Sequence, residues 1–156
     1  MSHSIFKTTI KAIAQKRLYG NWMTLGLEAL DRDYELAWAV LAARIKPIAG
    51  LVRACFGLGT EIRLGWPFPY WTAVELSPGA PVPPGMVSVV IPAGPYLALD
   101  KGPEVSLDEA YDFIYNNWEG TQKEYTVNHS RFCFEQYGPE GLNSGRVTLF
   151  MSLAAA

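Results

Sequence analysis

The segment Arg53-Ala54-Cys55-Phe56-Gly57 is echoed about 80 residues further along the chain by Arg131-Phe132-Cys133-Phe134-Glu135. Both copies lie in short apolar segments typical of β-strands, and the predicted elements around them follow the same order. This recurrence indicates an internal duplication in which each half is one β-α-β-β unit.

The first half, residues 5–76, begins with a predicted strand over residues 5–18. Residues 24–45 are predicted to form a helix, because Tyr34, Trp38, Leu41 and Ile45 recur at helical spacing. Pro47 is placed to end that helix. Strands over residues 51–56 and 70–76 complete the unit.

The second half, residues 86–153, follows a stretch in which six of nine residues, 77–85, are proline or glycine and predict a linker. A strand over residues 86–99 comes first. A helix over residues 107–119 follows, preceded by Ser106 and Glu109 in the spacing of a capping box. Strands over residues 131–137 and 146–153 end the unit.

The expected fold class is therefore α+β, with two β-α-β-β units related by a pseudo-twofold axis in one domain, residues 1–156. We expect the helices to cover one face of each unit's sheet, leaving a ligand cleft between the halves on the other face. Strand alternation is predicted to turn Val74, Leu76, Phe134 and Leu149 toward the helices. The face of the cleft would then carry Trp71, Glu75, Cys133, Glu135, Tyr137 and Phe150.

Composition excludes several classes of function. The net charge is -2 and no stripe of lysine or arginine is present, so nucleic acid is not an expected partner. No apolar run approaches the ~20 residues that span a bilayer, so neither a membrane partner nor a location outside the cytoplasm is expected. Cys55 and Cys133 stand far apart with no metal-ligand spacing, which predicts reduced, packed thiols and no metal or cofactor.

Three motifs carry a resemblance to a known family: Ile91-Pro92-Ala93-Gly94-Pro95-Tyr96, Phe134-Glu135-Gln136-Tyr137, and the strand from Tyr70 to Leu76. In this order and spacing they resemble the GyrI-like family, the effector-binding domain of AraC-type and MerR-type multidrug-responsive transcription regulators. The resemblance implies a cleft in which a glutamate among aromatic rings recognises cationic, lipophilic compounds. By position, that glutamate is Glu135.

The resemblance also has departures. Regulators of the family carry a helix-turn-helix segment, whereas this chain starts almost directly with the first strand. We therefore expect a stand-alone sensor or sequestering protein, whose protein partner would be a second copy in a homodimer or a separate regulator. Trp66-Pro67-Phe68-Pro69 is unusually rich in aromatic residues and proline, which predicts an entrance of different shape.

The ligand is expected to be an amphipathic cation. A carboxylate in an apolar cleft is costly when unpaired and favourable when a cation neutralises it, and aromatic ring faces attract organic cations. The residues predicted to contact it are Glu135, Trp71, Trp66, Phe68, Glu75, Tyr137, Tyr96 and Phe150. Tyr70 is expected to pack under the helix, and Tyr34, Trp38, Tyr111 and Trp118 are better explained as core residues.

Other interpretations stay open. A glutamate in mid-strand commonly faces solvent on an exposed sheet, which would remove its role. Some members of the family are hydrolases that open strained electrophilic natural products, and Glu135 with Tyr137 or Tyr96 offers the residues for such catalysis. An interaction module comparable to a gyrase inhibitor is a third class. We favour binding over catalysis.

Overall fold

The computed structural model describes residues 6–25, 30–59, 68–119, 121, 123–128, 133–139, 141 and 146–155. Their strands are β1 (Lys7–Ile13), β2 (Lys16–Leu25), β3 (Val52–Gly59), β4 (Phe68–Leu76), β5 (Val87–Ile91), β6 (Gly94–Lys101), β7 (Tyr125–Val127), β8 (Cys133–Tyr137) and β9 (Val147–Ala155). The helices are α1 (Leu30–Ile45), the 3-10 helix η3 (Lys46–Leu51), α2 (Leu107–Phe113) and the π-helix η4 (Ile114–Trp118). These strands form antiparallel pairs in a sheet that carries the two helices, which confirms the α+β class.

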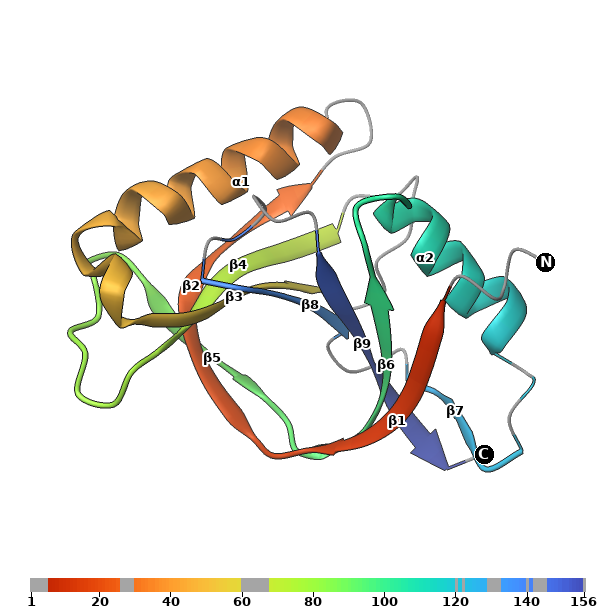
Figure 1. Ribbon diagram of the computed structural model, residues 1–156. Helices are drawn as coiled ribbons and strands as arrows, with labels where there is room; N and C mark the ends of the chain where they lie inside the picture. Colours follow the sequence, from red (N-terminus) through yellow and green to blue (C-terminus); the bar gives the residue numbers. More distant parts are fainter. Residues whose placement is uncertain are drawn as a thin grey trace.

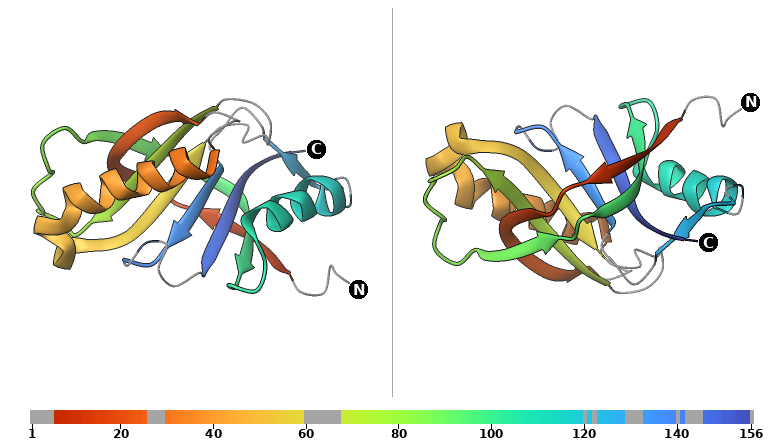
Figure 2. Two further views of the ribbon diagram at one scale, coloured as in Figure 1. Left: turned by 90° about the horizontal axis from the view of Figure 1, so that it is seen from above. Right: turned by 90° about the horizontal axis from the view of Figure 1, so that it is seen from below.

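The main sheet has the strand order β1-β6-β9-β8-β3-β4-β2-β5, and β7 pairs with β9 beside it. Every pair of neighbouring strands is antiparallel. The helices α1 and α2 lie on the same side of this sheet, and β5, together with the adjoining parts of β1 and β2, curls away from them (Figure 1). Seen from the helix side, β8 and β9 run between the two helices (Figure 2).

Two core clusters occupy the two faces of the sheet. One packs the sheet against the helices and contains Trp38, Leu41, Ile114 and Trp118. The other lies on the face where the sheet curls, and contains Phe56, Tyr96, Phe134 and Phe150. Both faces of the central strands are therefore buried.

The predicted helix over residues 24–45 starts too early. Thr24 belongs to β2, where it pairs with Pro69 of β4, and α1 begins at Leu30. Pairing with β4 continues the ladder as far as Leu25, so strand contacts prevail over the helical pattern there.

The two long strands predicted over residues 5–18 and 86–99 are each two strands. Lys7 pairs with Asp100 and Ile13 with Gly94, after which the chain bends and Lys16 pairs with Ile91. Pro92 lies at the second break, where a residue without an N–H cannot continue the ladder. The two bent strands thus pair along most of their length.

The start of the second helix is confirmed. Ser106 caps α2 by accepting a hydrogen bond from the backbone N–H of Glu109, with 3.1 Å between Oγ and N. The predicted helix over residues 107–119 holds as α2 followed by one π-helical turn that ends at Trp118. No helix among the described residues is long and apolar enough to cross a bilayer.

Candidate functional site

Among the described residues, one carboxylate is buried on the helix-covered face of the sheet. Glu135, in the middle of β8, is 2% exposed, and no other charged side chain of the described residues is buried. No lysine, arginine or histidine of the described chain forms an ion pair with it. A buried charge without a cationic partner must be compensated by hydrogen bonds or by a ligand.

Four tyrosine hydroxyls surround this carboxylate. Glu135 Oε1 accepts hydrogen bonds from Tyr70 at 2.8 Å, Tyr137 at 3.0 Å and Tyr34 at 3.2 Å. Glu135 Oε2 accepts one from Tyr111 at 2.9 Å. The hydroxyls of Tyr34 and Tyr137 also lie 3.0 Å apart. The donors come from four elements, namely α1, β4, α2 and β8.

Aromatic rings pack around the same point. The rings of Tyr34 and Tyr70 are 5.3 Å apart, and Trp38 meets Tyr137 edge-on at 5.0 Å. Tyr34 and Trp38 are one helical turn apart on α1, which points both rings at the sheet. The site therefore combines one anionic group with several ring faces. We call Glu135 and its four tyrosines the carboxylate cage.

Burial dominates the electrostatics of the cage. It raises the pKa of the Glu135 carboxyl above its ordinary value, while the hydrogen bonds from the four tyrosines, Tyr70 first, act in the opposite direction. Burial, together with the nearby charge of Glu135, also raises the pKa of the Tyr34, Tyr70, Tyr111 and Tyr137 hydroxyls. The phenols therefore stay protonated at neutral pH and act as hydrogen-bond donors to Glu135.

The predicted orientation of β8 is wrong. Cys133 and Tyr137 belong to the core cluster under the helices, and Glu135 contacts Tyr34 and Tyr111 of those helices. Phe134 points to the opposite cluster, although it was expected under the helices. Alternation fixes which residues share a face, but it cannot name the face when both faces are buried in apolar surroundings.

Of the eight predicted contact residues, the structure brings Glu135 and Tyr137 together. Trp71, Tyr96 and Phe150 pack in the cluster on the other face of the sheet. There Tyr96 donates to the carbonyl of Pro92 at 2.7 Å, and Phe150 stacks on Phe134 at 4.6 Å.

The remaining three lie elsewhere. Glu75 is part-exposed and forms an ion pair with Lys16, with 3.3 Å between Oε2 and Nζ. Trp66 falls outside the described residues, and of Phe68 the structure describes the backbone in β4.

Sequence reasoning missed three members of the cage. Tyr70 does pack under α1, as expected, but its hydroxyl was not assigned a role. Tyr34 and Tyr111 were explained as core residues. A buried tyrosine needs a hydrogen-bond partner, whereas a buried phenylalanine does not. Tyrosine in place of phenylalanine at several predicted core positions is therefore the sequence signal for a buried polar group.

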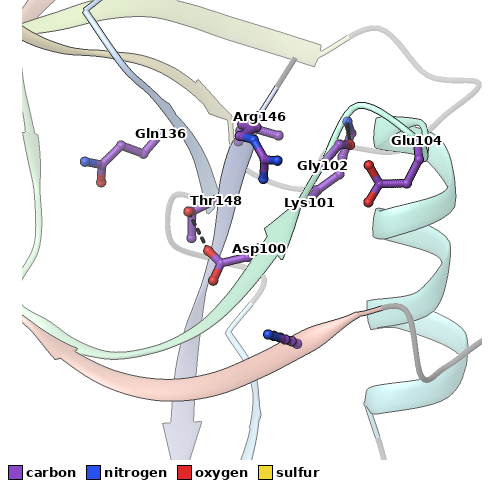
Figure 3. A pocket seen from close by; sticks show the side chains of 9 residues that line it. Asp100, Lys101, Gly102, Glu104, Gln136, Arg146 and Thr148 are labelled. Carbon is purple, nitrogen blue, oxygen red and sulfur yellow. Dashed lines mark hydrogen bonds between the residues drawn. The ribbon is translucent and has the colours of Figure 1, made fainter. Parts of the chain in front are cut away.

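A hollow of about 540 Å³ lies away from the carboxylate cage and has a different chemistry. It opens at the ends of β1, β6, β8 and β9, and charged side chains from several segments line it, among them Lys7, Asp100, Lys101, Glu104 and Arg146 (Figure 3). Thr148 donates a hydrogen bond to Asp100 there, at 2.7 Å. Both signs of charge are present, so the lining favours no single class of ligand.

Comparisons with known proteins show the fold. No protein-family model and no curated protein sequence matches the chain. Three solved structures superpose over nearly its whole length. The EcmrR C-terminal domain has a TM-score of 0.66 and 18% identity, covering 97% of this chain and 99% of that one.

The other two are equally extensive. An integron cassette protein from the mobile metagenome of Vibrio cholerae has a TM-score of 0.64 and 13% identity, covering 94% and 95% of the two chains. SAV2435 bound to tetraphenylphosphonium has a TM-score of 0.64 and 12% identity, covering 95% and 94%. These likenesses confirm the predicted resemblance to the GyrI-like effector-binding domains at the level of the fold.

Proposed function

We propose that this chain binds amphipathic, cationic small molecules between α1 and α2, with Glu135 as the counter-charge. The observation that carries the proposal is the carboxylate cage, a fully buried carboxylate that is held by hydroxyls alone and has no cationic partner among the described residues. The resident donors orient the charge without neutralising it. A lipophilic cation would supply the missing positive charge.

The surrounding rings suit the same class of ligand. A cation over an aromatic face gains roughly 0.5 to 2 kcal/mol, depending on how much water is excluded. Tyr34, Tyr70, Tyr137 and Trp38 supply such faces within the cage and beside it. A neighbour of the same fold, SAV2435, was solved with tetraphenylphosphonium, which is a cation enclosed in aromatic rings.

The ligand would enter from the helix side. Tyr70 and Tyr137, which come from strands, are buried, whereas Tyr34 and Tyr111, which come from the helices, are part-exposed. The helix tyrosines therefore lie closer to the protein surface than the strand tyrosines do. A ligand would have to displace their hydroxyls from Glu135 and move these side chains aside to lie between α1 and α2.

We also infer that the two halves are related by duplication. Exchanging β1 with β5, β2 with β6, β3 with β8 and β4 with β9 converts the strand order of the sheet into its own reverse. The exchange pairs α1 with α2, and each of these helices contributes one tyrosine to Glu135. This supports a site built on the pseudo-twofold axis, where both halves meet.

Tetraphenylphosphonium and tetraphenylborate test the proposal, because they share a shape and differ in the sign of the charge. At a cation concentration of 100 times Kd, binding adds about 2.7 kcal/mol to the stability of the folded state. For a chain of this length that corresponds to a rise in Tm of about 5–10 °C. We expect this rise with the phosphonium and none with the borate. Equal stabilisation by both ions, or by neither at millimolar concentration, would refute the proposal.

A further inference from the structure

Gly57 lies directly opposite Glu135. The two residues are partners in the register of β3 and β8, at the centre of the sheet. A Cβ atom placed on Gly57 would overlap the hydroxyl of Tyr70 and would lie 2.7 Å from both Tyr70 Cζ and Glu135 Oε1. Real Cβ atoms do not approach other atoms so closely. The φ angle of Gly57 is outside the left-handed region, so this position requires glycine for its space.

The Tyr70 hydroxyl uses this space. Its hydrogen bond to Glu135 Oε1, at 2.8 Å, is the shortest of the four that the carboxylate accepts. Tyr70 is 1% exposed and packs against Tyr34 and Leu25, so its ring cannot move aside at low cost. A side chain at position 57 would therefore push the hydroxyl away from the carboxylate.

Position 57 also has a special place in the duplicated sequence. In the repeated segments with which the two halves align, Gly57 corresponds to Glu135. Gly57 and Glu135, which face each other across β3 and β8, are thus equivalent residues of the two halves. One carries a carboxylate and the other has no side chain. A second carboxylate in that place would repel the first at close range.

We propose that Gly57 is a positioning residue for cation binding, because it leaves the space in which the Tyr70 hydroxyl reaches Glu135. The hydrogen bond from Tyr70 then keeps Glu135 in its ionised form. The proposal rests on the proposed function for its effect on affinity. Its effect on Glu135 itself needs no ligand, so the two ideas can fail separately.

The effect of Gly57 passes through the charge of Glu135. Burial favours the neutral carboxyl, and among the groups that oppose burial the Tyr70 hydroxyl comes first. If Tyr70 is displaced, the pKa of the carboxyl rises further and less of it is ionised at a given pH. The ionisable groups around Glu135 are Tyr34 from α1, Tyr70 from β4, Tyr111 from α2 and Tyr137 from β8, with Cys133 near Tyr111.

The test compares Gly57→Ala with Gly50→Ala, a substitution at a glycine whose added Cβ would meet no atom within 4 Å. Tetraphenylphosphonium affinity is measured by calorimetry from pH 5 to pH 9, and the Glu135 carboxyl is titrated by carbon NMR in the free protein. We expect Gly57→Ala to weaken tetraphenylphosphonium binding at least tenfold at neutral pH. It should also move to higher pH both the midpoint of the Glu135 titration and the midpoint of the pH dependence of binding. Gly50→Ala should match the wild type, and Tyr70→Phe should reproduce the shift of the Glu135 midpoint.

The outcomes separate clearly. If Gly57→Ala leaves the Glu135 titration at its wild-type midpoint, the proposal is overturned, whatever happens to binding. If the wild type binds no cation but Gly57→Ala still moves the titration, the role of Gly57 stands and the proposed function falls. Should Gly57→Ala fail to fold, Gly57→Ala combined with Tyr70→Leu decides. Recovered folding would show that the Tyr70 contact is the reason for glycine, and a second failure would overturn the proposal.

Discussion

Replacement of Glu135 by glutamine is the most direct perturbation of the carboxylate cage. Glutamine keeps the shape of the side chain and an oxygen that can accept from the tyrosines, but it removes the negative charge. Affinity for a cation should fall, because the ligand still loses its hydration on entering the site while its counter-charge is gone. A neutral ligand of similar shape, such as triphenylphosphine oxide, should bind as well as before or better.

The expected size follows from the burial of Glu135. It is 2% exposed, and loss of one partner of a desolvated charge pair costs about 3–5 kcal/mol, compared with about 1 kcal/mol or less at an exposed site. Each 1.4 kcal/mol is about a tenfold change in Kd. The hydroxyls of the strand tyrosines, Tyr70 and Tyr137, still hydrogen-bond to the side chain at position 135 and offset part of this loss. We therefore expect a decrease of at least tenfold that is selective for cations.

Isothermal titration calorimetry with tetraphenylphosphonium and triphenylphosphine oxide measures both arms. Glu75→Gln is the matched control. Glu75 is also a glutamate in a strand, but it is part-exposed, forms an ion pair with Lys16 and is not a member of the cage. It should leave both affinities unchanged. Unchanged cation affinity in Glu135→Gln would refute the assignment of Glu135 as counter-charge. Retained binding together with loss of turnover on a strained electrophile would favour the hydrolase, in which Glu135 acts as general acid or base.

Three further predictions follow from the same geometry. Because the pKa of the Glu135 carboxyl is raised in the folded state, the folded chain holds the proton of this carboxyl to a higher pH than the unfolded chain does. The tighter binding of the proton stabilises the folded state fully below about pH 4.5, and this stabilisation is lost as the pH rises through the raised pKa. Urea denaturation from pH 4 to pH 9 should show this loss in the wild type and not in Glu135→Gln. The pKa of the Tyr34, Tyr70 and Tyr111 hydroxyls is raised in the folded state, so above pH 10 these phenols ionise first in the unfolded chain and the stability of the folded state should fall. Ultraviolet titration should show these tyrosines ionising together with unfolding. Reversible ionisation in the folded state would contradict this prediction. Trp71→Ala, by contrast, should lower the Tm but change tetraphenylphosphonium affinity less than about twofold, because Trp71 packs on the opposite face of the sheet; a large loss of affinity would place the ligand on that face instead.

The sequence was sufficient for the elements whose signals are local. Ser106 and Glu109 marked the start of α2 because a cap needs residues three apart, and the repeated Cys-Phe segments marked β3 and β8. The end of β2 was not predictable in this way, since Thr24 is held in a strand by Pro69, which is distant in sequence.

Three of the five cage residues escaped prediction for a related reason. Tyr34 and Tyr111 have helical spacing that suits an apolar core, and nothing near Tyr34 indicates that its acceptor, Glu135, lies 101 residues away. The side of the sheet on which Glu135 lies was not predictable either. Cys133, Phe134 and Tyr137 are all buried, so the sequence of β8 shows no alternation between a solvent-exposed and a buried face.

The exchange of strands between the halves has a consequence for proteolysis. β1 pairs with β6 and β2 with β5, so each half contributes strands to the ladder of the other. Cleavage of the linker, residues 77–85, would break one peptide bond and none of these ladders. The two fragments should remain associated under native conditions with the cage assembled. Neither fragment alone can form it, because Tyr34 and Tyr70 lie on one side of the cut and Glu135, Tyr111 and Tyr137 on the other.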